Sequence, residues 1–197
     1  MNVTSKAKLY LKKDPILKPL VEKLEISQWY GTGDHLLDLV EIITNQQLSY
    51  HAGKTIFSRF NKLLGSPHPQ PQDILGLSDE ALRSCGYSRS KVIYIKNLAT
   101  SINGGELILD TLSQLNDREI ISLLTAIKGI GPWTAEMFLI FSLRRPDIFS
   151  VGDLGLRTAV SRLYRVDKND KEAILEISKK WAPFRSFACR FLWASLT

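Results

Sequence analysis

The chain has 197 residues, of which 44% are hydrophobic and 23% are charged. This balance is typical of a folded globular protein, and it excludes an intrinsically disordered chain. A chain of this length buries enough surface to fold without a disulfide or a structural metal. Lysine and arginine outnumber aspartate and glutamate by 26 to 20, giving a formal net charge of +6, which favours a polyanionic partner such as nucleic acid.

Cysteines and terminal sequences indicate the compartment. Cys85 and Cys189 have no C-x-x-C spacing, which excludes a cysteine zinc site or a four-cysteine iron–sulfur cluster, so we expect two free thiols in a reducing compartment. Residues 1–13 are lysine-rich and lack the apolar stretch of a signal peptide, and no segment approaches the roughly 20 apolar residues of a membrane span. We therefore predict an intracellular protein, in the bacterial cytoplasm or nucleoid or in a eukaryotic nucleus.

Helix signals recur along the first half of the chain. Asp14 followed by Pro15 predicts a helix start, with apolar positions continuing to Leu24. Residues 92–95 are apolar enough for a strand, but their polar flanks keep helical spacing, and we interpret them as helix. The other predicted segments are a mostly buried helix capped by Asp34, a helix over 49–64, a proline-rich loop over 66–72, a short helix over 78–85 and a longer helix over 88–102.

The second half continues this pattern. Asn116 and Glu119 form a capping-box pattern before an apolar helix that reaches Ile127. Further helices are predicted over about 133–143, 154–164, 170–181 and 184–196. Because no long alternating segment remains, the fold class is predicted to be all-α.

Two of these helices are joined by a glycine-rich turn, Lys128-Gly129-Ile130-Gly131, which is followed by Pro132. Glycines permit a tight turn, and proline suits the first turn of the next helix. Such a helix–hairpin–helix lets backbone N–H groups approach a phosphate at a helix N-terminus, gripping DNA without reading its sequence. The alternative interpretation is a simple helical hairpin inside a bundle.

Two segments around the hairpin are distinctive: residues 124–135 (LTAIKGIGPWTA) and 149–153 (FSVGD). They resemble the helix–hairpin–helix superfamily of DNA base-excision glycosylases. Three further segments, residues 43–49 (ITNQQLS), 82–92 (LRSCGYSRSKV) and 181–188 (WAPFRSFA), resemble its alkylpurine branch, the 3-methyladenine DNA glycosylase II type, in a compact form without the N-terminal β-rich domain.

The resemblance implies a two-lobe helical fold within a single glycosylase domain, 1–197. Central helices, about 34–110 and 111–165, would carry the helix–hairpin–helix at 117–143. The N-terminal helices and 166–197 would form the second lobe, with the base pocket between the lobes.

Asp153 is the residue that the resemblance implies for catalysis. It follows the hairpin by 22 residues, the spacing found in the family. A carboxylate there stabilises the oxocarbenium-like sugar formed when an N-glycosidic bond breaks, and it can also align the attacking water. The competing interpretation is that Asp153 only caps the helix beginning at Leu154, and both roles are compatible. Asp147, the rival carboxylate, is expected in a solvated loop.

Pocket residues also follow from the resemblance. Trp133 stands where relatives that also cut the strand place a Schiff-base lysine, so the chain is expected to be a monofunctional hydrolase without lyase activity. Trp133 and Trp193 would line the base pocket and attract cationic alkylated purines by stacking and cation–π contact. Met137 and Leu154 occupy positions where pocket tyrosines are expected, which leaves the range of lesions open. For Trp193, a core position in the last helix is an equal alternative.

DNA contacts complete the predicted site. Gln47 and Leu48 match positions that enter the duplex when the target nucleotide is flipped, with Leu48 as an apolar wedge. Lys128, Gly129, Ile130 and Gly131 would contact the DNA backbone. The resemblance implies no catalytic metal or cofactor, although it allows a monovalent cation on hairpin carbonyls when DNA is bound.

The predicted function is excision of alkylated purines, such as 3-methyladenine and 7-methylguanine, from double-stranded DNA in base excision repair. The partner is damaged duplex DNA, not a membrane, and nothing calls for more than a monomer. Alternatives are a glycosylase for deaminated, etheno or oxidised purines, and a non-catalytic protein that binds damaged DNA. A helix-turn-helix regulator is the weakest alternative, because no recognition helix is evident.

Overall fold

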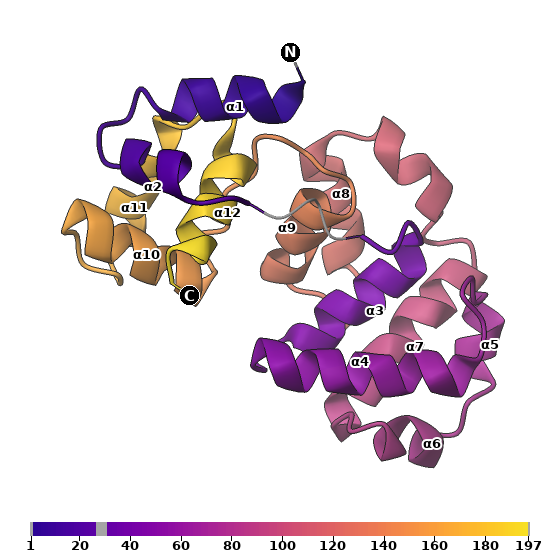
Figure 1. Ribbon diagram of the computed structural model, residues 1–197. Helices are drawn as coiled ribbons and strands as arrows, with labels where there is room; N and C mark the ends of the chain where they lie inside the picture. The colour runs from indigo at the N-terminus through magenta and orange to yellow at the C-terminus, as the bar shows by residue number, and fades with distance from the viewer. Residues whose placement is uncertain (1, 27–30, 197) are drawn as a thin grey trace. The chain divides into compact units, whose positions relative to one another are not determined.

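The computed structural model describes residues 2–26 and 31–196 (Figure 1), which form helices, turns and loops without a strand. The all-α prediction is therefore confirmed. The elements in chain order are α1 (Val3–Leu11), α2 (Lys18–Lys23), α3 (His35–Asn45), α4 (Tyr50–Leu64), α5 (Pro71–Leu75), α6 (Asp79–Ser84), α7 (Arg89–Asn103), the 3-10 helix η1 (Leu109–Gln114), α8 (Asp117–Thr125), α9 (Pro132–Phe141), α10 (Leu154–Tyr164), α11 (Lys171–Lys179) and α12 (Arg185–Ala194).

The chain forms two compact units. Unit 1 combines residues 1–29 with residues 144–197, and unit 2 comprises residues 30–143. This division places α10 with the N- and C-terminal helices, whereas the sequence-based division grouped everything up to residue 165 with the central helices. The reason is packing: Leu156, Ala159 and Val160 of α10 belong to the same buried cluster as residues of α1 and α12.

Unit 1 is built around α12, which packs against α1, α2 and α10. Its core also contains the fully buried indole of Trp181. Asp14 links the N-terminal segment to this core, because its Oδ2 accepts hydrogen bonds from the Tyr164 hydroxyl at 2.6 Å and from Trp181 Nε1 at 3.0 Å. Burial alone would raise the pKa of Asp14, but these bonds and two backbone N–H groups lower it below its ordinary value.

Unit 2 is built around α3, which packs against α4, α7 and α9. Most of α3 is buried, as its apolar sequence predicts, and Leu39, Val40 and Ile43 are fully inaccessible. Asp38 anchors the preceding loop, where its Oδ1 accepts from the Thr32 amide at 2.7 Å and the Thr32 hydroxyl at 2.8 Å. The unit therefore has a rigid central helix whose C-terminal end leads directly into the turn at residues 46–49.

Polar caps set the helix starts, as the sequence predicts. Asp34, Ser49, Ser78 and Ser88 each accept a backbone N–H from the first turn of the following helix, and Asn116 forms a capping box with Glu119. Each cap satisfies N–H groups that have no partner within the helix.

Other boundaries differ from the prediction. The helix expected from Asp14 begins only at Lys18, since Pro19 has no N–H to donate and fits only the first turn. The proline-rich segment 66–72 ends in a helix, because Pro71 starts α5. Three elements, α1, α5 and η1, were not predicted.

Three observations concern partners and chemistry in the described ranges. Both cysteines are buried free thiols, as predicted. Across residues 2–26 and 31–196, no helix combines the length and apolar character needed to cross a membrane. The same residues contain no group of three or more histidine, cysteine, aspartate or glutamate side chains arranged to hold a metal ion.

Replacing Asp14 with alanine is expected to lower the free energy of unfolding by roughly 2 kcal/mol, because the Tyr164 and Trp181 donors lose a charged acceptor. Chemical denaturation at pH 7 measures this loss. Asp170→Ala is the control, since Asp170 also accepts a helix N–H, from Ala173, but lies at an exposed position.

The pKa of Asp14 is lowered in the folded state, so its contribution is complete above its ordinary value of 3.8 and is lost as the pH falls through the lowered value. The difference between wild type and Asp14→Ala should therefore shrink at pH 3. A difference that stays constant from pH 7 to pH 3 would contradict this assignment.

Candidate nucleic-acid interface and catalytic carboxylate

The glycine-rich turn between α8 and α9 forms the predicted hairpin in unit 2. Gly129 has φ +108°, and a Cβ there would lie 2.1 Å from Cγ of Tyr94. Glycine is therefore required both for its backbone conformation and for the close approach of the Tyr94 ring. A Cβ on Gly131 would meet nothing within 4 Å, so the backbone of the hairpin is open to an approaching ligand on this side.

The hairpin ends at the start of α9, where Gly131 is the N-cap and Pro132 follows in the first turn. N–H groups at a helix N-terminus and the helix dipole favour an anion. Of the predicted hairpin contacts, Lys128 is exposed, whereas Ile130 is only 4% exposed. Ile130 can therefore offer a ligand only its backbone.

Side chains from two other segments brace the hairpin from within unit 2. Nδ2 of Asn97, on α7, donates to the Lys128 carbonyl at 3.0 Å. Nε2 of Gln46 donates to the Gly129 carbonyl at 3.0 Å and to Oγ1 of Thr134 at 2.9 Å. The hairpin conformation is thus fixed by side chains that lie far away in sequence.

The predicted wedge lies on the turn between α3 and α4. Gln47 has φ 55°, a left-handed conformation that costs a residue other than glycine about 1–2 kcal/mol. Leu48 follows and is 41% exposed, and Ser49 then caps α4. The turn therefore presents an apolar side chain to solvent on a constrained backbone.

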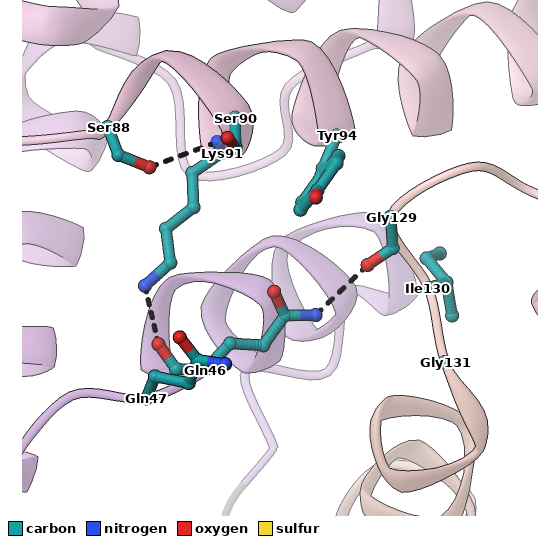
Figure 2. Close-up of a pocket in the computed structure, with 9 residues that line it drawn as sticks. All are labelled: Gln46, Gln47, Ser88, Ser90, Lys91, Tyr94, Gly129, Ile130 and Gly131. Carbon is teal, nitrogen blue, oxygen red and sulfur yellow. Dashed lines mark hydrogen bonds between the residues drawn. The ribbon is translucent and has the colours of Figure 1, made fainter.

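A polar pocket of about 540 Å³ separates this turn from the hairpin (Figure 2). Lys91, on α7, extends across it, and its Nζ donates to the carbonyl oxygens of Thr44 at 2.6 Å and Gln46 at 2.8 Å. Burial lowers the pKa of Lys91 from its ordinary value. The pocket is lined by Gln46, Gln47, Ser88, Ser90, Lys91, Tyr94, Gly129, Ile130 and Gly131.

Two predicted pocket residues lie on α9, also in unit 2. Trp133, in the first turn, is half-buried, whereas Met137, one turn later, is only 4% exposed. Met137 therefore packs into the core of its own unit, while the Trp133 ring keeps an accessible surface.

Asp153 lies in unit 1 at the N-terminus of α10. Its Oδ1 accepts the Leu156 amide at 2.8 Å, confirming its capping geometry. The same oxygen accepts Nε1 of Trp193, on α12, at 3.0 Å. Two N–H donors from different helices therefore hold the orientation of this carboxylate.

Gly155 permits this arrangement. A Cβ on Gly155 would lie 3.1 Å from Asp153 Oδ1 and 3.3 Å from Cδ1 of Trp193, closer than most real contacts. Trp193 is partly buried against the core of unit 1, and its indole N–H also bonds Asp153. Leu154, the neighbouring predicted pocket residue, is 59% exposed.

Asp147, the rival carboxylate, is engaged in a structural ion pair. Its two oxygens accept Nε of Arg185 at 2.8 Å and Nη2 at 2.9 Å, and Oδ1 also accepts the Arg185 amide at 3.2 Å. It joins the loop before α10 to the start of α12, so the expectation of a merely solvated loop residue is wrong.

Sequence reasoning missed three contributors to these sites: Gly155, Lys91 and the indole donor of Trp193. Gly155 carried a signal, because glycine is unfavourable within a helix and calls for a packing reason. Lys91 and Trp193 carried none, since the carbonyls and the carboxylate that they bind come from distant segments.

Positive charge is concentrated in unit 1. This unit contains seventeen lysine and arginine residues against nine aspartate and glutamate residues, a formal charge of +8, and unit 2 contains nine against eleven, a formal charge of −2. The positive excess therefore lies in the unit that holds Asp153, where it favours a polyanion.

Comparison with known proteins identifies the family of the chain. Residues 40–184 match the family model described as HhH-GPD superfamily base excision DNA repair protein. The chain is 37% identical to DNA-3-methyladenine glycosylase 1 of Schizosaccharomyces pombe over 79% of this chain and 70% of that protein. It is 34% identical to the DNA-3-methyladenine glycosylase of Saccharomyces cerevisiae, covering 86% of this chain and 62% of that protein.

A solved structure shows the same fold. The Schizosaccharomyces pombe 3-methyladenine DNA glycosylase in complex with abasic DNA superposes with a TM-score of 0.87 at 32% identity, covering 96% of each chain. The family model covers most of the chain, and the similarity in fold extends across both units. The chain therefore belongs to the HhH-GPD superfamily of base excision DNA repair proteins.

Proposed function

We propose that this protein is a monofunctional DNA glycosylase that removes alkylated purines, of the 3-methyladenine and 7-methylguanine type, from duplex DNA and leaves an abasic site. The observation that carries the proposal is the Asp153 carboxylate, held by Leu156 and Trp193 in a chain of this family. The names of its relatives and the abasic DNA bound to one of them support this substrate class.

The proposed reaction is hydrolysis of the bond between the sugar C1′ and the purine nitrogen. An N3- or N7-alkylated purine is cationic, so it leaves with the bonding electron pair as a neutral base and needs little acid catalysis. The sugar then carries the positive charge, which the Asp153 carboxylate stabilises. Water adds to C1′ and gives up a proton, to Asp153 or to solvent, which completes the abasic product.

The side chain at position 133 supports hydrolysis without strand cleavage. A lyase step requires an amine that forms an imine with C1′, and the Trp133 indole has no such amine. Lys128 directly precedes Gly129 and is exposed, and its positive charge suits a DNA phosphate. The proposed chemistry requires no catalytic cofactor, and a monovalent cation at the hairpin would serve DNA binding alone.

Duplex DNA would be held by its backbone and opened by the wedge. The N–H groups around Gly131 and the N-terminus of α9 suit a phosphate, and Leu48 suits the gap left by an extruded base. The aromatic faces of Trp133 and Trp193 favour a cationic purine by roughly 0.5–2 kcal/mol per ring. Met137 is buried and Leu154 is aliphatic, so these two positions add no aromatic face to base recognition.

Asp153→Asn is expected to lower the single-turnover rate of 7-methylguanine release by about 100- to 1000-fold, because the charge that stabilises the sugar cation is lost. Affinity for the duplex should change by less than about threefold. Asp170→Asn is the matched control, since Asp170 caps α11 in the same way and should keep the wild-type rate. An Asp153→Asn variant with wild-type turnover would refute the catalytic assignment.

Trp193→Phe keeps an aromatic ring but removes the N–H that binds Asp153. We expect kcat to fall about tenfold while KM for the lesion duplex stays within about twofold, because one hydrogen bond to a charged group is lost. Steady-state kinetics on a defined lesion duplex measure both constants.

Trp181→Phe removes the equivalent indole bond to Asp14 and serves as the control. It should lower stability and leave kcat unchanged. If Trp193→Phe raises KM and leaves kcat intact, Trp193 only stacks on the base and does not orient the carboxylate.

A further inference from the structure

The turn that carries Leu48 is tied to the hairpin by two side chains that no predicted role covers. Lys91 holds the backbone of the turn through the carbonyls of Thr44 and Gln46. Gln46 in turn holds the hairpin through the Gly129 carbonyl and the Thr134 hydroxyl. Figure 2 shows the Lys91 ammonium bonded to the Gln46 backbone carbonyl and the Gln46 side chain extending to the Gly129 carbonyl. We name the pair Lys91 and Gln46 the polar clamp.

Lys91 places a positive charge at the negative, C-terminal end of α3. Carbonyls in the last turn of a helix lack partners within that helix and carry its negative end, which attracts a cation. Lys91 supplies that cation to Thr44 and, beyond the helix, to Gln46. The hydroxyl of Thr44 is itself fixed by the Val40 carbonyl at 2.7 Å and the buried Tyr87 hydroxyl at 2.9 Å.

The left-handed Gln47 explains why the turn needs this support. Residues in such conformations persist where the surrounding structure fixes them. The backbone is held immediately before Gln47 by Lys91, and immediately after it by the Leu48 amide, which donates to the Asn45 carbonyl at 3.2 Å. A Cβ on Gly53 would lie 1.9 Å from Asn45 Oδ1, so Asn45 also packs closely against α4.

The hairpin is also held by the helix that carries Lys91. Tyr94 packs against Gly129, and Asn97 binds the Lys128 carbonyl. Lys91, Tyr94 and Asn97 all belong to α7, so one helix contacts both the wedge turn and the hairpin. The spacing between Leu48 and the hairpin is therefore built into unit 2 before any DNA arrives.

We propose that Lys91 and Gln46 are positioning residues that hold the Leu48 turn at a fixed spacing from the hairpin, so that gripping the DNA backbone places the wedge for base extrusion. The inference rests on the proposed function, because it takes Leu48 to enter damaged duplex DNA. Neither residue needs to contact the reacting atoms. Losing the clamp should impair base extrusion while the hairpin still binds the DNA backbone.

The test uses Lys91→Met and Gln46→Met, which keep unbranched side chains and remove the donors. Lys96→Met is the matched control: it removes one positive charge from the same helix, where Lys96 forms an ion pair with Asp79. Two quantities are measured for each variant: affinity for an undamaged duplex, and extrusion, reported by 2-aminopurine fluorescence in a duplex with a tetrahydrofuran abasic-site analogue.

We expect both clamp variants to reduce the extrusion equilibrium at least tenfold while affinity for undamaged duplex changes less than threefold. Their double variant should lose little more than either single one, because Lys91 and Gln46 form two successive links of one connection from α7 through the turn to the hairpin. Lys91→Arg should restore most of the extrusion, since it keeps a cationic donor. Lys96→Met should change extrusion by less than twofold.

Wild-type extrusion in both clamp variants, or equal losses in Lys91→Met and Lys96→Met, would overturn the proposal. If Lys91→Met unfolds, Gln46→Met and Lys91→Arg still distinguish a positioning role from a purely structural role. A purely structural role would lower the melting temperature, the duplex affinity and the extrusion together. The extrusion assay needs no base release. A wild type that extrudes but excises nothing would therefore refute the proposed function and leave the clamp standing.

Discussion

The position of one carboxylate is the constraint on which this account depends. Asp153 receives two N–H donors, one from the first turn of α10 and one from the indole of Trp193 on α12. Gly155 leaves the space that lets those groups meet. Capping is therefore not an alternative to catalysis here, because the bonds that begin a helix also fix the direction of the group that would stabilise a sugar cation.

In unit 2, one helix likewise supports two features proposed to contact DNA. Glycine at position 129 lets α7 pack closely against the hairpin, and the same helix reaches the turn that exposes Leu48. The hairpin proposed to bind phosphate and the proposed wedge thus share one scaffold. Such preorganisation suits an enzyme that must unstack a base at a free-energy cost, because the turn is already ordered before DNA binds.

Local features of the sequence predicted much of this molecule. The caps at Asp34 and Asn116, the hairpin and the family were all confirmed, because each depends on residues close together in the chain. The grouping of α10 with the terminal helices, the ion pair of Asp147 and the bonds made by Lys91 and Trp193 were not predicted. These depend on side chains that meet only after folding, and no periodicity or spacing encodes such meetings.

We propose that this protein breaks a glycosidic bond by hydrolysis and cuts no strand. The most direct measurement is chromatography of the bases released by wild-type protein from DNA treated with a methylating agent, with borohydride added to a parallel reaction. We expect free 3-methyladenine or 7-methylguanine, strands that break only after alkali, and no protein trapped on DNA. Absence of base release, or a covalent protein–DNA adduct formed with borohydride, would contradict hydrolysis without strand cleavage.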